Sequence, residues 1–266
     1  HEKYMHVIGV RSDMNGFFHI HPGNEYAETY GGGNPSLWRT EYIFPKPGLY
    51  KIWSEVKKDG VVHSFGHEPL NVEGEGVRED KKVSFGRSVV AGGYQVALLA
   101  DASFGKGVEH DLSFDIHDSE GNEVAVEEYL GADMHLAIIK DDWSEFVHTH
   151  PEGHDGHMME DMHGHSFRFV QTADAHDGEP EVDVGTDEAI NFHVRFPSAG
   201  LYRAYAQFRP MGSNLPRDEA LTAMFWIEVK DKAPFPISPW WMLLIISLIA
   251  IVVLSRFVKK YIGKEK

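Results

Sequence analysis

The strongest constraint on the fold is that one arrangement of histidines occurs twice in the sequence. The two arrangements match position by position, always 129 residues apart. The first copy contains Met5, His6, His19, His21 and Pro22, and the second contains Met134, His135, His148, His150 and Pro151. An internal repeat of this kind predicts two related structural units with related sites.

A second shared block follows each copy. It is Phe-Pro-Lys-Pro-Gly-Leu-Tyr at 44–50 and Phe-Pro-Ser-Ala-Gly-Leu-Tyr at 196–202, where the separation has grown to 152 residues. The second copy therefore carries 23 additional residues between its two blocks.

Short segments rich in β-branched and aromatic residues, separated by Gly, Pro and Asn, are typical of strands. In the first copy these segments are 5–10, 16–21, 38–44, 49–56 and 61–72. In the second copy they are 84–90, 93–100, 110–117, 123–129, 134–140, 144–149, 165–171, 189–196, 201–208 and 221–230. We therefore expect an all-β chain with two immunoglobulin-like β-sandwich domains, followed by one C-terminal transmembrane α-helix.

The expected division follows composition. It assigns 1–73 to the first sandwich, 74–83 to a charged linker, 84–230 to the second sandwich with a His/Met-rich insertion at 152–174, 231–236 to a stalk, 237–258 to the transmembrane helix and 259–266 to a basic tail. Residues 84–133 read as strands ahead of the second Met-His pair, whereas four residues precede the first pair. The first repeat is therefore either a minimal domain or lacks its front.

The segment from Ile237 to Leu254 carries no charge, which is typical of a membrane span. Trp240 and Trp241 lie at its start, and the tail after Leu254 has a charge of +4. By the positive-inside rule, the tail is cytoplasmic and the repeats face the periplasm. We expect a single-pass protein of the bacterial cytoplasmic membrane.

The chain has no cysteine, which excludes disulfides, thiolate zinc sites and iron–sulfur clusters. It has 17 histidines and a formal net charge of -16. Such a charge disfavours nucleic acid and favours cations or basic partners. Any bound metal must use His, Met, Asp or Glu.

Alternate residues of a strand share a face, so the two histidines of each His-x-His pair lie about 7 Å apart on one side. A hairpin through residues 13–16 would bring either Met5 or His6 onto that face. Imidazole suits copper, and Met sulfur favours Cu(I). The other interpretation remains open: the pairs could be packing motifs whose imidazoles bind backbone carbonyls.

Two further groups are candidate ligands. His63 and His67 lie on the closing strand of the first repeat, where they could complete a site with His19 and His21. The insertion is metal-binding by composition, with four candidate ligands at His154, His157, His163 and His165. The predicted metal-ligand set is Met5, His6, His19, His21, His63, His67, Met134, His135, His148, His150, His154, His157, His163 and His165.

No phosphate-binding loop, nucleophile elbow or HExxH motif is present, so the sequence predicts a protein without catalytic activity. The shared blocks resemble those of a group of bacterial exported proteins, and residues 84–230 resemble a YtkA-like immunoglobulin-type envelope domain. The resemblance implies a β-sandwich of the bacterial envelope associated with heavy-metal handling.

Two functional hypotheses follow. The first is a membrane-anchored periplasmic copper-binding protein that captures or transfers Cu(I) or Cu(II). The second is an accessory or scaffolding subunit of a larger membrane complex, electron-transfer or photosynthetic, whose sandwiches dock partners such as a basic periplasmic electron carrier.

Overall fold

The computed structural model of the chain describes residues 5–22, 40–58, 61–76, 79–151, 189–216 and 219–231. All regular secondary structure in these residues is β-strand, which confirms the predicted all-β class. Within the same ranges no helix has the length and apolar character needed to cross a membrane. The expected transmembrane helix at 237–258 lies outside the described residues, as does the insertion at 152–174.

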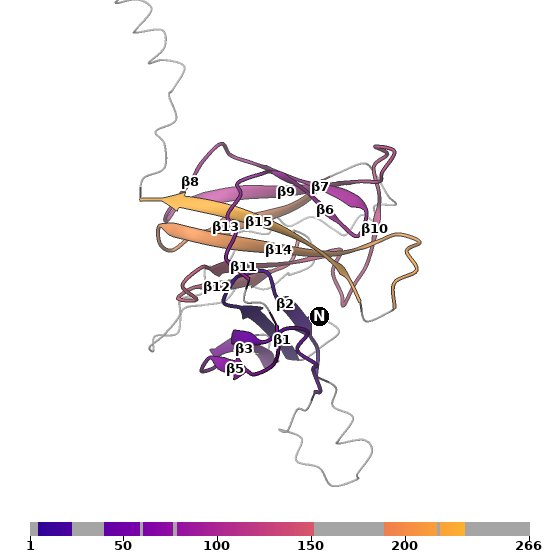
Figure 1. Cartoon of the computed structure of the whole chain (residues 1–266). Helices are drawn as coiled ribbons and strands as arrows, with labels where there is room; N and C mark the ends of the chain where they lie inside the picture. The colour runs from indigo at the N-terminus through magenta and orange to yellow at the C-terminus, as the bar shows by residue number, and fades with distance from the viewer. Residues whose placement is uncertain are drawn as a thin grey trace, which may run out of the picture. The chain divides into compact units, whose positions relative to one another are not determined.

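The described strands form three sheets (Figure 1). The first sheet has the order β2-β1-β3-β4, with β5 also on β3; its strands are β1 (Met5–Arg11), β2 (Phe17–Ile20), β3 (Gly48–Lys58), β4 (Val61–Gly66) and β5 (Leu70–Val72). The middle sheet has the order β12-β11-β14-β15-β8, with β10 also on β14; its strands are β8 (Phe104–Gly105), β10 (Val126–Glu127), β11 (Met134–Lys140), β12 (Phe146–Thr149), β14 (Gly200–Pro210) and β15 (Leu221–Lys230). The outer sheet has the order β13-β9-β7-β6; its strands are β6 (Ser88–Ala91), β7 (Tyr94–Ala100), β9 (Glu109–His117) and β13 (Ile190–Arg195).

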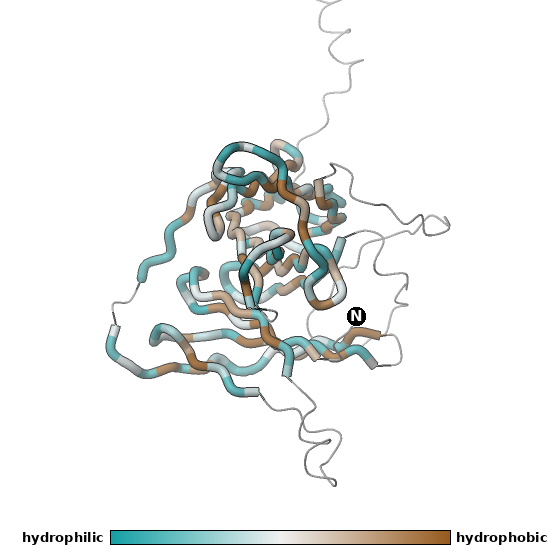
Figure 2. Tube along the Cα trace, turned by 90° about the vertical axis from the view of Figure 1, so that its right-hand side faces the viewer, coloured by the Kyte–Doolittle hydropathy of each residue, from teal (hydrophilic) through white to brown (hydrophobic). Residues whose placement is uncertain are grey.

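The middle sheet is buried on both faces. Leu136 and Ile138 of β11 pack into a core shared with the outer sheet, which gives the second repeat its sandwich. Ala137 and Ile139, which alternate with them, pack against Ile8 of the first sheet. Figure 1 shows the three sheets stacked, and Figure 2 shows hydrophobic and hydrophilic positions alternating along much of the chain. Alternation places successive side chains on opposite faces of a strand, so one sheet can serve two cores.

The first repeat is a single sheet in the described residues, although the sequence indicated a sandwich at 1–73. Its apolar face is covered by the second repeat. The expected strand at 38–44 is also absent where the structure describes it, because residues 40–44 have no strand partner and Ile43 is exposed. The apparent strand at 61–72 is two strands, β4 and β5, and both pair with β3.

The first and middle sheets face each other with a local twofold relationship. Phe17 stacks on Tyr205 with ring centroids 4.2 Å apart. Trp53 stacks on Phe146 with centroids 4.9 Å apart. Phe17 and Phe146 are equivalent positions of the repeat, as are Trp53 and Tyr205. Each contact is therefore repeated with the two copies exchanged.

Part of the expected linker is tied to both repeats. Glu79 accepts a hydrogen bond from Arg11 at 2.9 Å, and Lys81 donates to Asp141 at 3.1 Å. The backbone carbonyl of Lys82 accepts a bond from the Trp226 indole. The linker thus contacts both repeats and holds them together rather than separating them.

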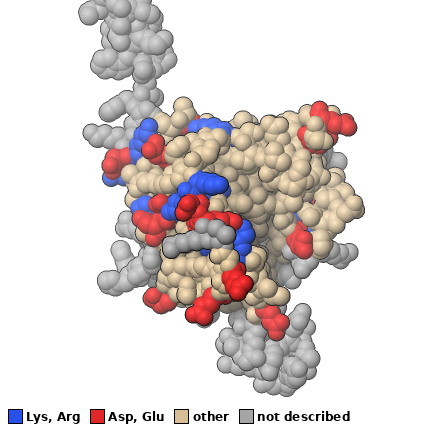
Figure 3. Space-filling view, in the orientation of Figure 1, with Lys and Arg blue, Asp and Glu red and all other residues tan. Residues whose placement is uncertain are grey.

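On the face drawn in Figure 3, acidic and basic side chains are intermixed.

Candidate metal centre

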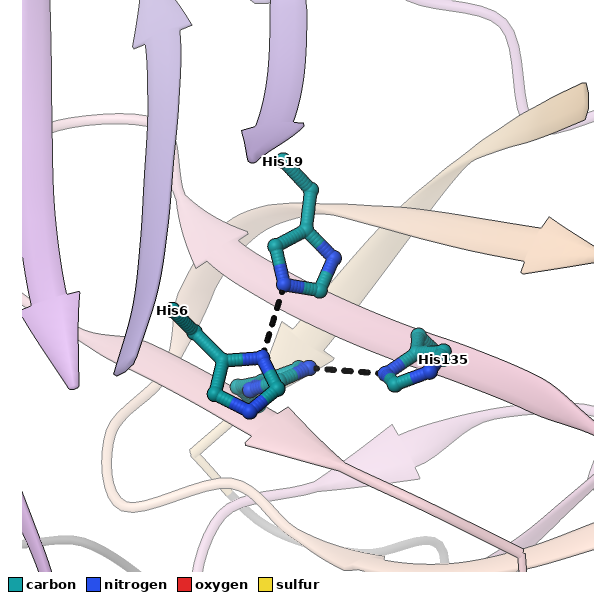
Figure 4. Close-up of side chains that lie close together, drawn as sticks. His6, His19 and His135 are labelled. Atoms are coloured by element: carbon teal, nitrogen blue, oxygen red, sulfur yellow. Dashed lines mark hydrogen bonds between the residues drawn. The ribbon is translucent and has the colours of Figure 1, made fainter. Parts of the chain in front are cut away.

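Six histidines from the two repeats meet between the first and middle sheets. His6 lies on β1 and His135 on β11, at positions that face the opposite repeat. The others lie on or just after the paired hairpin strands β2 and β12: His19, His21, His148 and His150. Figure 4 shows His6, His19 and His135 converging. We call these six residues the histidine cluster.

Ring nitrogens within each repeat lie at contact distance. His6 Nδ1 is 3.0 Å from His19 Nε2 and 2.8 Å from His21 Nε2. In the second repeat, His135 Nδ1 is 3.4 Å from His148 Nε2 and 3.0 Å from His150 Nε2. The same atoms of equivalent residues are used in both copies.

The two repeats also approach each other across the cluster. The ring centroids of His6 and His148 are 5.1 Å apart, and those of His19 and His135 are 5.3 Å apart. The two contacts are equivalent, because the twofold relationship that relates the aromatic stacks also relates His6 to His135 and His19 to His148. The cluster is therefore one site built by both repeats.

Side chains and backbone outside the cluster orient three of the imidazoles. His19 Nδ1 donates to Gln207 Oε1 at 2.8 Å, and His135 Nε2 donates to the Tyr129 carbonyl at 2.7 Å. Because the proton of each neutral ring is on the nitrogen that donates, His19 Nε2 and His135 Nδ1 carry lone pairs toward the cluster. His148 Nδ1 contacts Glu55 Oε2 at 2.6 Å. Carbonyl or carboxylate partners on the outer nitrogen are characteristic of metal-binding histidines.

The contacts to Glu55 and Gln207 cross between repeats. Glu55 pairs with His6 across β1 and β3, and Gln207 pairs with His135 across β11 and β14. They are equivalent residues, 152 positions apart. Glu55 nevertheless contacts His148 of the second repeat, and Gln207 contacts His19 of the first. Each repeat thus orients a histidine of the other.

Burial keeps three of the imidazoles neutral, those of His6, His19 and His148. Desolvation, with repulsion from neighbouring imidazoles, lowers the pKa of His6 to about 2. The same causes hold the pKa of His19 and of His148 well below the ordinary histidine value. Burial also raises the pKa of Glu55 to about 8. A neutral imidazole is the form that binds a metal ion.

The donor set fits a metal ion. One nitrogen from each of His6, His19, His135 and His148 can be chosen so that all four lie within 4.8 Å of one another. With metal–nitrogen bonds of about 2.0–2.1 Å, neighbouring nitrogens on one ion lie about 3.3–3.6 Å apart. The contacts of 3.0 Å between His6 and His19 and of 3.4 Å between His135 and His148 are close to this spacing. These four buried histidines could hold a metal ion.

The structure places the two predicted methionine ligands away from the cluster. Met134 is fully buried in the core between the middle and outer sheets, on the opposite face of β11 from His135. Met5 likewise alternates with His6 on β1, so the hairpin brings the histidine and not the thioether to the site. The cluster therefore lacks the sulfur donors that favoured Cu(I) in the sequence.

His63 and His67 do not join His19 and His21. His63 is exposed on β4, and His67 contacts Ser54 at 2.7 Å. Ser54 alternates with Glu55 on β3 and so lies on the other face of the first sheet. The remaining predicted ligands, His154, His157, His163 and His165, are outside the described residues.

Sequence analysis missed Glu55, Gln207 and the Tyr129 carbonyl. The first two had a detectable signal, because they follow the shared Phe-Pro block at the same spacing in both repeats. A buried polar residue repeated at an equivalent strand position indicates a polar partner. The Tyr129 carbonyl had no such signal.

No curated protein and no solved structure matches the chain. A family described as "Domain of unknown function (DUF8832)" matches residues 1–73 and 88–231. The match spans both repeats and includes all six cluster histidines. The chain therefore belongs to the DUF8832 family, and the matched residues include the two sheets that form the histidine cluster.

Proposed function

We propose that this protein binds copper at the histidine cluster and captures or transfers it without catalysis. The observation that carries the proposal is the convergence of buried, neutral imidazoles from both repeats on one site. Imidazole suits copper, zinc and nickel, and copper binds most strongly of the divalent first-row ions. The absence of cysteine leaves histidine as the main strong ligand in the chain.

The proposed location is the outer side of a bacterial cytoplasmic membrane. The uncharged segment Ile237–Leu254 and the basic residues after it support a single span with a cytoplasmic tail. Protease added to spheroplasts should digest the repeats and spare the tail. Protection of the repeats would overturn this orientation.

Paired melting curves with and without copper test the binding proposal. In the protein carrying both His19→Gln and His148→Gln, the copper-dependent stabilisation should disappear. For one site that binds only the folded state, it amounts to about 2.7 kcal/mol at a hundredfold excess over the dissociation constant. His63→Gln is the matched control, because His63 is exposed on the other face of the first sheet, and it should leave the shift unchanged.

The packing interpretation makes the opposite prediction. If the imidazoles only satisfy buried polar groups, the double variant should lose about 1–3 kcal/mol per unsatisfied group without any metal. A parent protein with no copper-dependent shift, combined with that loss, would refute metal binding. The accessory-subunit hypothesis would then be the better explanation.

A further inference from the structure

We infer that the histidine cluster is a pair of three-imidazole half-sites, one per repeat, which together hold two copper ions. The first half-site consists of His6, His19 and His21, and the second of His135, His148 and His150. This inference rests on the proposed function and specifies its stoichiometry and its ligands.

The contacts around His6 Nδ1 and His135 Nδ1 support three ligands per half-site. An imidazole nitrogen has one lone pair or one N–H in the ring plane, so it makes one good hydrogen bond. His6 Nδ1 nevertheless has two ring nitrogens within 3.0 Å, from His19 and His21. A metal ion bound between the three nitrogens would use all of them at once.

The second half-site repeats this geometry with the same atoms. His135 Nδ1 has His150 Nε2 at 3.0 Å and His148 Nε2 at 3.4 Å. Since His135 Nε2 donates its N–H to the Tyr129 carbonyl, His135 Nδ1 is an acceptor and faces these neighbours with its lone pair. Two equivalent sets of three nitrogens point to two equivalent ions.

A single ion held by the central four histidines leaves part of the cluster unexplained. His21 and His150 are not members of that set of four, yet each places its Nε2 at 2.8 or 3.0 Å from a central nitrogen. Three-imidazole coordination without sulfur suits copper. Cu(I) also brings the smallest charge into a buried site, where an uncompensated charge is costly.

A single ion on the four central histidines and two ions on the two half-sites predict different effects of His21→Gln and His150→Gln on the amount of bound copper. The test uses the full chain in which His154, His157, His163 and His165 are changed to Ser, and Met158, Met159 and Met162 to Leu, so that the insertion offers Cu(I) neither imidazole nor thioether ligands. Protein is loaded anaerobically with Cu(I), passed over a desalting column, and analysed for copper per chain. We expect two ions in this parent and one in each single variant, because each variant removes one ligand from one half-site.

Controls separate ligand loss from misfolding. His21 and His150 are only partly buried, and each variant must reproduce the metal-free melting temperature of its parent. If Gln lowers that temperature, the Ala variant at the same position is measured instead. His67→Gln, on the other face of the first sheet, should retain two ions.

The stoichiometry distinguishes failure of this inference from failure of copper binding itself. One ion in the parent and in both variants would indicate a single ion on the four central histidines, which overturns the two-ion site and leaves copper binding intact. Two ions in every variant would overturn the ligand assignment. No retained copper in the parent would overturn both proposals.

Discussion

Replacing Trp53 by Ala tests whether the proposed metal site depends on docking of the two repeats. Trp53 is a large buried side chain of the core between the first and middle sheets, and its ring lies nearly parallel to that of Phe146, at an angle of 14°. Loss of a buried Trp typically costs about 3–5 kcal/mol, which includes the lost stacking and the cavity that remains. Because whole domains have about 5–15 kcal/mol of stability, this loss should substantially weaken the docking.

Two measurements show whether Trp53→Ala destabilises the docking of the first repeat on the second. The free energy of unfolding, from urea curves followed by far-UV circular dichroism, should fall by about 3–5 kcal/mol. Amide hydrogen exchange should increase in β1 and β3, whereas β7 and β9 of the outer sheet should remain protected because their core is separate. Copper affinity should also fall although no ligand has changed, since each repeat orients a histidine of the other.

Ile43→Ala is the matched control. Ile43 also belongs to the first repeat, but it is 91% exposed, so its replacement should change the stability by no more than about 0.5 kcal/mol. The reasoning is refuted if Trp53→Ala leaves hydrogen exchange in β1 and β3 unchanged. It is also refuted if the variant loses stability but binds copper as tightly as the parent.

Two further predictions concern the polar surroundings of the cluster. Glu55→Gln, which gives His148 the kind of partner that His19 has in Gln207, should weaken copper binding about 10–100-fold in a chelator competition, because an amide replaces the carboxyl group that contacts His148 Nδ1; unchanged affinity would show that Glu55 has no part in the site. In metal-free protein, the free energy of unfolding should decrease as pH falls below about 6.5, because His6, His19 and His148 stay neutral in the folded state and take up protons on unfolding. Each contributes up to about 1.4 kcal/mol per pH unit, and the raised pKa of Glu55 opposes only one of the three. Urea curves at pH 7 and pH 5.5 measure the slope, and a stability that rises on acidification would contradict the assignment.

Local sequence patterns were enough to predict the repeat and most of the strands. Alternating apolar residues and turn-forming residues led to β1, β2, β3, β11, β12 and β14, and the β1–β2 and β11–β12 hairpins place His6 beside His19 and His135 beside His148 as expected. These features depend on neighbours within one hairpin. The strand expected at 38–44 failed because strand propensity needs a partner strand, which residues 40–44 do not have.

The sequence by itself determined that each repeat carries a matched set of histidines and that, without cysteine, a metal would have to use them. It could not determine that the two sets form one site. That was decided by packing: the first repeat supplies one sheet, its apolar face must be covered, and the middle sheet is apolar on both faces. Docking then placed His6 and His135, rather than Met5 and Met134, between the sheets, and it brought Glu55 and Gln207 to histidines of the other repeat. Pairing of β4 with β3 left His63 on the opposite face of the first sheet. The reason is physical, because contacts between residues about 90–190 positions apart depend on which faces are buried together, and short-range patterns do not encode that.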